Sequence, residues 1–430
     1  MFDSERLLGH SGSRRPLTRR DFLRLTSGSA VLLGGIGMGF SLPEWLEAVV
    51  TQAEASPRSS GVDSILSKAP VARYWIGSNT RGVDCLSCHK ADDGVTGGLF
   101  DHGRSIAKCT LCAQGCVIRD GERGGCRARA NVGGELRSLV YGRPVSIHVD
   151  PIEKKPFYHF LPGSAAFSLA TAGCPLHCKF CQNWEISQAR PEDFDVEFVP
   201  PDRVAGAAAE RKAPVIAFTY NEPTVFIEYL TDIARVAREG GISSVLISCG
   251  FMNQEPLEEM CSTLDAIKID LKGYDEEFYR RVCGAELKPV LRSIKQVSQS
   301  GVHLEIVNLV VPTLNDSDRM IEGLCRWVVS EVGPDVPVHF TRFHPEYQML
   351  NLPPTPVETL EKAYEIAKAE GLHYPFVGNV PGHPGNNTYC PKCARPVVVR
   401  TGFFVSELHV EDGRCEYCAQ TIAGVWKNPR

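Results

Sequence analysis

Between about residues 151 and 380, short apolar runs alternate with segments whose apolar positions recur at helical spacing. Six runs have the composition of buried strands: AAFSLATAG, PVIAFTYNEP, SSVLISCG, DAIKIDLKG, HLEIVNLVVP and PVHFTRFHP. Three intervening segments predict amphipathic helices that end near a glycine: VFIEYLTDIARVAREGG, LKPVLRSIKQVSQSG and VETLEKAYEIAKAEG. This alternation is typical of a parallel sheet. We therefore expect an α/β fold, a partial (β/α)6 barrel with its chemistry at the carboxyl ends of the strands.

The sequence on either side of this region has a different texture. Residues 1–55 contain paired arginines and an uncharged run, and residues 56–84 are rich in Ser, Pro and Gly, as expected of a linker. Residues 85–150 are rich in Cys and Gly and show little periodicity, which is typical of a small segment built around metals. Residues 386–430 have short strand-like runs around two CxxC pairs. We expect these four segments to flank the barrel as separate units.

The N-terminal segment has the features of a twin-arginine export signal. Arg19 and Arg20 precede nineteen uncharged residues, and Ala53-Glu54-Ala55 offers a cleavage site. Export would place the protein in the periplasm or another extracytoplasmic compartment. The alternatives are a cytoplasmic location or an N-terminal membrane anchor, because nineteen uncharged residues can just span a bilayer. Five glycines in the run disfavour a transmembrane helix, so we expect no stable membrane span.

Charge and cysteine content narrow the classes of function. The 46 basic and 51 acidic residues give a net charge of −5, with no block of like charges, so we expect no binding of nucleic acid. The 17 cysteines are the unusual feature, and thirteen of them fall in or beside tight clusters. In a chain of this size such clusters indicate metal ligands rather than a disulfide framework.

Three cysteines follow directly after the first predicted strand, in GCPLHCKFCQNW. The spacing of Cys174, Cys178 and Cys181 allows one loop to bind three corners of a [4Fe–4S] cluster, for which thiolates are the ligands. The next cysteine, Cys249, is 68 residues further on. We interpret the triplet as a cluster whose fourth iron is open to a substrate or cofactor. The alternative is a zinc or ferredoxin-type site that a distant residue completes.

The triplet, with Phe180 as the aromatic residue of C-x(3)-C-x-aromatic-C, resembles the motif of the radical S-adenosylmethionine (SAM) superfamily. Over roughly residues 105–427 the chain is similar to the SAM enzyme of the AmmeMemoRadiSam system, a group similar to pyruvate formate-lyase activating enzymes. The similarity rests on EKKPFYHFLPGS, CQNWEIS, FTYNEPTVFIEY, IKIDLKGYDEEFY and VVPTLNDS. It implies that SAM binds the open iron and is cleaved reductively, which yields methionine and a 5′-deoxyadenosyl radical that abstracts hydrogen.

The same resemblance implies cofactor-binding roles for residues at the strand ends. Glu222 corresponds to the residue that receives the methionine amino group, although Tyr-Asn replaces the two glycines that usually precede it. Asp270 and Lys272 correspond to residues near the SAM carboxylate, and His344 to a residue near the ribose. The alternative for each is a buried charge pair or a core histidine whose hydrogen bonds are satisfied.

Two CxxC pairs near the C-terminus predict a zinc ribbon. Cys390 and Cys393 are separated from Cys415 and Cys418 by 21 residues, a spacing typical of a closed four-cysteine site. Such a site stabilises a segment that is too short to have its own core. An iron site is the alternative.

The N-terminal cysteines are predicted to form a second metal site. Cys109, Cys112, Cys116 and Cys126 match the C-x2-C-x3-C…G-x-C arrangement of the family that the chain resembles, which implies one tetrathiolate site of undetermined metal. The isolated cysteines Cys249, Cys261, Cys283 and Cys325 are interpreted as packing residues, with a catalytic thiol as the alternative for Cys249.

A further pair of cysteines forms the sequence Cys85-x2-Cys88-His89, the attachment signature of c-type haem. Haem is usually attached to chains exported unfolded, which conflicts with the twin-arginine route. The rival interpretations are a ribbon with Cys109 and Cys112, or a metal site with His89 or His102.

We therefore expect a radical SAM enzyme with an electron donor and a protein substrate, as the resemblance to activating enzymes implies. A small molecule is the alternative substrate. The competing class is a non-catalytic iron–sulfur electron-transfer or scaffold protein, which would not need the open cluster or the charged residues at the strand ends.

Overall fold

The computed structural model describes residues 65–66, 68–77 and 106–430, all within the compact unit Trp45–Arg430. The predicted export signal, most of the linker, Cys85, Cys88, His89 and His102 lie outside the described residues. Within the described part of the chain, no helix has the length and apolar character needed to cross a membrane.

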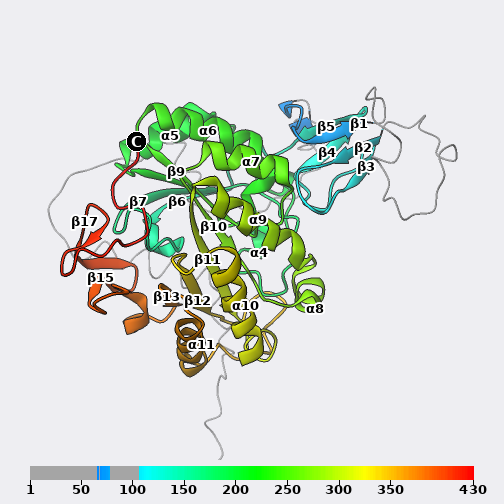
Figure 1. Cartoon of the computed structure of the whole chain (residues 1–430). Coiled ribbons are helices and arrows are strands. Elements are labelled where there is room, and N and C mark those ends of the chain that lie inside the picture. The colour runs from blue at the N-terminus through cyan, green and yellow to red at the C-terminus, as the bar shows by residue number, and fades with distance from the viewer. Residues whose placement is uncertain (1–64, 67, 78–105) are drawn as a thin grey trace, which may run out of the picture. The chain divides into compact units, whose positions relative to one another are not determined.

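An eight-stranded sheet forms the centre of the fold, and neighbours in the sheet are also neighbours in sequence. Strands β7 to β13 are parallel, and β6 pairs antiparallel with β7 at one edge (Figure 1). The strands are β6 (Ser146–Pro151), β7 (Ala165–Ala170), β8 (Val215–Phe218), β9 (Ser243–Ser248), β10 (Ala266–Asp270), β11 (His303–Val310), β12 (Val338–Arg342) and β13 (Pro375–Gly378). The prediction of six parallel strands was therefore one short, because the four residues of β13 give too brief an apolar run to be distinguished.

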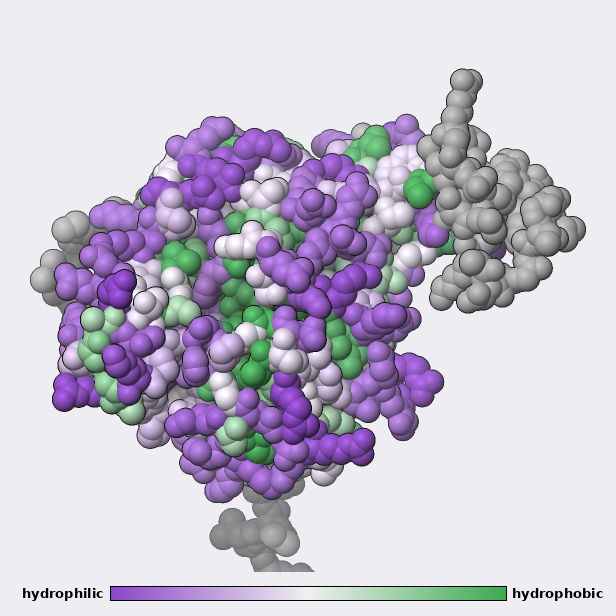
Figure 2. Space-filling view, in the orientation of Figure 1, coloured by the Kyte–Doolittle hydropathy of each residue, from purple (hydrophilic) through white to green (hydrophobic). Residues whose placement is uncertain are grey.

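Six helices connect successive parallel strands and follow the curve of the sheet from α5 to α11 (Figure 1). Three match the predicted helical segments, and α9 ends at Gly301, whose φ of 82° stops the helix in a left-handed conformation. The six are α5 (Pro201–Glu210), α6 (Ile227–Glu239), α7 (Gln254–Thr263), α9 (Leu287–Ser300), α10 (Asp318–Glu331) and α11 (Val357–Ala369). Figure 2 shows the mostly hydrophilic outer face that results, with apolar residues gathered in a band.

Short helical turns occur in the loops. They are η2 (Ile152–Lys154), α4 (Trp184–Ser187), η3 (Pro191–Asp193), η4 (Pro223–Phe226), α8 (Glu276–Phe278), the π-helical η5 (Tyr279–Cys283) and η6 (Pro384–Asn386).

The amino-terminal end of the sheet is closed by a buried polar network. Glu305, in β11, is fully buried and accepts hydrogen bonds from the backbone N–H groups of Tyr158 (2.9 Å) and His159 (2.8 Å). The side chain of His339, in β12, lies 2.6 Å from the other carboxylate oxygen. Burial would raise the pKa of Glu305, but the side chains of His303, whose Nε2 lies 3.0 Å from Oε1, and of His339 outweigh it and lower the pKa. The network therefore anchors the segment that follows η2 to the interior of the sheet.

The N-terminal cysteine-rich segment contains two small antiparallel sheets. One comprises β1 (Trp75–Gly77), β2 (Ile106–Cys109) and β3 (Val117–Arg119), and the other β4 (Arg129–Val132) and β5 (Glu135–Ser138). Arg129 is fully buried and forms an ion pair with Glu228 of α6, which also accepts a hydrogen bond from the Arg73 N–H at 2.8 Å. These contacts join the N-terminal segment to α6.

The C-terminal segment consists of five short strands, β14 (Thr388–Tyr389), β15 (Pro396–Thr401), β16 (Phe404–Leu408), β17 (Val410–Glu411) and β18 (Arg414–Cys415). Its buried residues pack with Tyr158 and with Phe376 of β13. Arg400 lies over the Tyr158 ring at 4.2 Å and donates a hydrogen bond to the Tyr158 carbonyl at 2.6 Å. The segment therefore packs against the β13 edge of the central sheet.

Candidate metal and cofactor sites

The cysteine loop, residues 173–181, leaves the carboxyl end of β7. Gly173 begins it with a φ of 98°, and its carbonyl accepts a hydrogen bond from the Asn221 side chain at 2.9 Å. The N–H groups of His177 and Lys179 donate to the carbonyls of Cys283 (2.9 Å) and Val282. The loop is thus held from two sides, and its position at the strand ends is where parallel sheets of this kind place their chemistry.

The three thiols of the loop lie in a charged environment, in which Cys178 is buried and Cys174 and Cys181 are half-buried. Burial raises the pKa values of Cys174 and Cys181. A hydrogen bond with the Cys283 thiol lowers the pKa of Cys178, and the Lys272 ammonium lowers it further. Cys283 was interpreted as a packing residue, but the structure places its thiol against Cys178. The sequence held no signal for this contact, because Cys283 belongs to a π-helical turn more than one hundred residues away.

Glu222 occupies the carboxyl end of β8 and is almost completely buried. Its Oε1 accepts hydrogen bonds from the Thr224 N–H (3.2 Å) and from the hydroxyl groups of Thr224 and Ser248, the latter at 2.7 Å. Its Oε2 accepts a hydrogen bond from the Cys249 N–H at 2.7 Å, and the Cys249 thiol is hydrogen-bonded to the same carboxylate. Glu222 therefore ties the end of β8 to the end of β9.

Asp270 and Lys272, at the end of β10, form an ion pair, as the alternative interpretation of these residues describes, with Nζ and Oδ2 3.2 Å apart. The structure adds Lys268, which is 4% exposed and pairs with the other Asp270 oxygen. Burial alone would raise the pKa of Asp270, but the two ammonium groups outweigh it and lower the pKa to about 2. The Lys272 Nζ also lies 5.7 Å from the centre of the Phe180 ring. The pair therefore directs positive charge toward the cysteine loop.

His344 follows β12 at the same end of the sheet, and its side chain is exposed. Partial desolvation of its ring and the charge of the nearby Arg342 lower its pKa. Among the described residues it has no hydrogen-bond partner. The structure therefore brings Glu222, Asp270 and Lys272 to the cysteine loop and leaves His344 at the outer rim.

The four C-terminal cysteines form a compact group. The sulfurs of Cys390 and Cys418 lie 3.6 Å apart, and those of Cys393 and Cys415 lie 3.8 Å apart. A tetrahedral ion with Zn–S bonds of about 2.3 Å separates its sulfurs by about 3.8 Å. Among the described residues this is the one group of His, Cys, Asp and Glu whose ligand atoms all lie within 4.8 Å of one another. The chain here fits a single tetrahedral ion.

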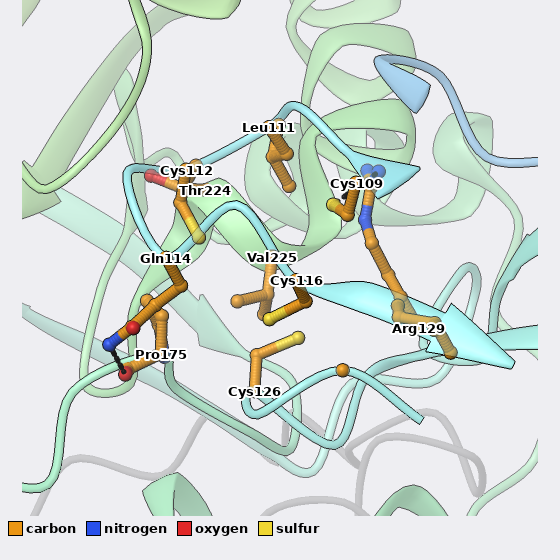
Figure 3. Close-up of a pocket in the computed structure, with 12 residues that line it drawn as sticks. Cys109, Leu111, Cys112, Gln114, Cys116, Cys126, Arg129, Pro175, Thr224 and Val225 are labelled. Carbon is orange, nitrogen blue, oxygen red and sulfur yellow. Dashed lines mark hydrogen bonds between the residues drawn. The ribbon is translucent and has the colours of Figure 1, made fainter. Parts of the chain in front are cut away.

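The N-terminal cysteine site, defined as Cys109, Cys112, Cys116 and Cys126, lines one pocket. Figure 3 shows the four side chains around a shared space, with Arg129 beside Cys109. The structure thus brings together the four cysteines that were predicted to bind one metal. Within the described residues, the sulfurs of these four cysteines do not all lie within 4.8 Å of one another, as those of the C-terminal group do. The same holds for the three cysteines of the loop.

The region around the cysteine loop is similar to known proteins. Residues 168–327 match the model of the radical SAM superfamily, which spans the cysteine loop, Glu222, Asp270 and Lys272 but not His344 or either flanking cysteine group. The pyruvate formate-lyase-activating enzyme of Clostridium pasteurianum is 25% identical over 194 residues, 42% of this chain and 77% of that enzyme. A solved radical SAM methyltransferase from Sphaerobacter thermophilus is 14% identical, with a TM-score of 0.42, over 55% of this chain and 72% of that one.

A longer match extends beyond the superfamily region. Uncharacterized protein MJ0808 of Methanocaldococcus jannaschii is 42% identical over 317 residues, which cover 73% of this chain and 94% of that protein. The similarity therefore includes sequence outside residues 168–327. With the superfamily model matched over the cysteine loop and the strand ends around it, this chain belongs to the radical SAM superfamily.

Proposed function

We propose that the protein is a SAM-cleaving enzyme that abstracts hydrogen from a residue of a protein substrate. The observation that carries the proposal is the cysteine loop at the carboxyl end of β7, directly beside Glu222, Asp270 and Lys272. Cys174, Cys178 and Cys181 would hold a [4Fe–4S] cluster and leave one iron for SAM. When bound, the cluster supplies the single electron that cleaves the C5′–S bond of SAM.

The chain's own residues would bind and orient the methionine end of SAM. The Lys272 ammonium is a compact point charge suited to the SAM carboxylate, and Asp270 holds it in place. The buried Glu222 carboxylate offers the negative charge that suits the SAM amino group. The Phe180 ring packs against Phe278, with centroids 6.4 Å apart, and would fix the loop around the third cysteine. His344, at the rim, would contact the ribose.

A polypeptide substrate is favoured by two observations. The named relative from Clostridium is an activating enzyme for another enzyme, pyruvate formate-lyase. Trp184, which is 37% exposed, stacks on Tyr347 close to the cysteine loop, with centroids 5.3 Å apart. Such a pair, one ring exposed and the other half-buried, is suited to contact with a peptide. We place the enzyme in the AmmeMemoRadiSam system on the motifs quoted above, with a small molecule as the second candidate substrate.

The flanking features complete the proposal. Zinc in the C-terminal site is supported by sulfur separations of 3.6 and 3.8 Å. Export through the twin-arginine route is supported by Arg19 and Arg20 and by the uncharged run that follows. That route carries folded proteins, which suits a chain that receives its cofactors in the cytoplasm.

The test is anaerobic reconstitution of the full chain, followed by reaction with SAM and dithionite. The wild type should form 5′-deoxyadenosine and show a cluster signal that SAM changes. The Cys174→Ala/Cys178→Ala/Cys181→Ala variant should show neither and keep its zinc. Cys261→Ala, a half-buried cysteine of α7, is the matched control and should behave as wild type.

A fully loaded wild type that forms no 5′-deoxyadenosine would instead favour the electron-transfer or scaffold class. Deuterium-labelled candidates then identify the substrate. Deuterium that enters 5′-deoxyadenosine from a protein supports the proposal, whereas deuterium from a small molecule alone contradicts it.

A further inference from the structure

The N-terminal cysteine site has an apolar lining and more space between its sulfurs than a single ion needs. Leu111, Ile118 and Val225 line the pocket together with the four cysteines. The sulfurs do not all lie within the 4.8 Å that the C-terminal cysteines satisfy in the described chain. Three of the cysteines occupy eight residues, Cys109 to Cys116, a spacing that mirrors that of the cysteine loop. Both features suit a cluster of several irons.

A buried cation accompanies these thiols. Arg129 is fully buried, and its Nη1 lies 4.0 Å from the Cys109 sulfur. Glu228 binds its Nη2, but its Nε is buried without a hydrogen-bond partner. A guanidinium in this position would partly compensate the negative charge of a tetrathiolate cluster and can donate to its sulfurs. The reduction potential of an iron–sulfur cluster is set by its solvent exposure and by nearby charges and hydrogen bonds. An apolar pocket with one guanidinium beside a cysteine sulfur would therefore influence that potential.

The N-terminal cysteine site also touches the cysteine loop directly. A side chain on Gly173 would overlap the carbonyl oxygen of Cys126, so the two backbones are in van der Waals contact. The Gln114 side chain, in the same pocket, donates hydrogen bonds to the carbonyls of Pro175 (3.0 Å) and Gly284 (3.3 Å). Pro175 follows Cys174 in sequence. The cysteines of the N-terminal site and those of the cysteine loop are therefore close to each other through backbone contacts.

The site is equally close to the strand ends that would bind SAM. Thr224 and Val225, which follow Glu222, line its pocket. The residues after β9 pair with its loop, since the Asn253 N–H donates to the Leu111 carbonyl at 3.1 Å. The site therefore packs against the loops that follow β8 and β9.

We propose that the N-terminal cysteine site holds a second iron–sulfur cluster that passes single electrons to the cluster on the cysteine loop. The inference rests on the proposed function. A small iron–sulfur or flavin protein reduces the second cluster by one electron, and that electron moves to the first. The C5′–S bond of SAM then breaks, with methionine and one deoxyadenosyl radical as products. Each turnover oxidises the donor by one electron.

Metal counting tests the site without reference to activity. We expect about eight irons per chain in the reconstituted wild type, since each [4Fe–4S] cluster holds four. Cys174→Ala/Cys178→Ala/Cys181→Ala should keep about four, with an electron paramagnetic resonance signal that SAM does not change. Cys112→Ser/Cys116→Ser should also keep about four, with the SAM-responsive signal. Zinc in the C-terminal site serves as the folding control. A loop variant with a second zinc and no iron would overturn the proposal.

Kinetics with two reductants tests the relay. In Cys112→Ser/Cys116→Ser, formation of 5′-deoxyadenosine with a reduced ferredoxin or flavodoxin should fall by about tenfold or more, a rise in barrier of at least about 1.4 kcal/mol. Dithionite, a small reductant, should still support the reaction. If 5′-deoxyadenosine formation falls equally with both reductants, or falls with neither, the proposed electron transfer between the two clusters is contradicted. A wild type inactive with dithionite would instead refute the proposed function, so the two failures are distinguishable.

Discussion

Replacing Asp270 with Asn tests how the carboxyl end of β10 is held together. Asp270 accepts ion pairs from Lys268 and Lys272, whose side chains are 4% and 14% exposed, while its own is 29% exposed. Asp270→Asn keeps the shape of the side chain but leaves two nearly buried ammonium groups without a counter-charge. Breaking a buried pair from one side is destabilising because a charge remains uncompensated.

The pKa of Asp270 gives the size of the expected loss in the free energy of unfolding. The pKa falls from an ordinary value of 3.8 to about 2 in the folded protein. One pKa unit corresponds to about 1.4 kcal/mol, so the carboxylate contributes about 2 kcal/mol to the free energy of unfolding. Because the folded-state pKa is lowered, this contribution is complete above the unfolded pKa and is lost as the pH falls from about 4 to about 2. At pH 7 the variant should therefore be about 2 kcal/mol less stable.

Urea unfolding at pH 7, with equal metal content in each protein, measures the loss. Asp318→Asn is the matched control, since Asp318 is 52% exposed and pairs with an exposed lysine at 2.7 Å. We expect it to cost no more than about 1 kcal/mol. Adding Lys268→Met to Asp270→Asn should recover part of the loss, because one uncompensated charge is removed. Equal stability of the two Asn variants would refute the reasoning.

Three further outcomes are expected. Cys415→Ser should lose the C-terminal zinc and unfold at lower urea with its iron content unchanged, which metal analysis and unfolding curves would show; retained zinc would contradict the ribbon. The pKa of His159 is lowered to about 3 by burial, so the unfolded chain takes up a proton first and stability falls as the pH drops from about 6.5 toward 3. In His159→Gln, the free energy of unfolding should depend less steeply on pH, by up to about 1.4 kcal/mol per pH unit. An unchanged slope would mean that other groups cause the pH dependence. Arg19→Lys/Arg20→Lys should keep the protein in the cytoplasm, as cell fractionation would show, and an unchanged location would contradict the twin-arginine route.

The sequence predicted the parts of the site that follow from strand order. Parallel strands bring their carboxyl ends to one edge, so Glu222 and Asp270 could be placed beside the cysteine loop once their strands were identified. The long helices were predictable because their apolar positions repeat over many residues. β13 was missed because four buried residues carry no periodicity.

Contacts between distant loops could not be predicted in this way. Cys283 reaches Cys178 only because η5 turns back onto the cysteine loop, and no local pattern specifies that return. Lys268 lies inside an apolar strand, where its charge becomes intelligible only once Asp270 is seen beside it. The contact between Gly173 and Cys126 likewise depends on how two separate segments dock.

Gly173 also gives a criterion for comparing related sequences. Its φ of 98° and its contact with the Cys126 carbonyl leave no room for a side chain. A substitution would push the cysteine loop away from the N-terminal segment and misplace both. Relatives that retain the four N-terminal cysteines should therefore retain glycine immediately before the first cysteine of the loop. In relatives that lack those cysteines, other residues can occupy the position of Gly173.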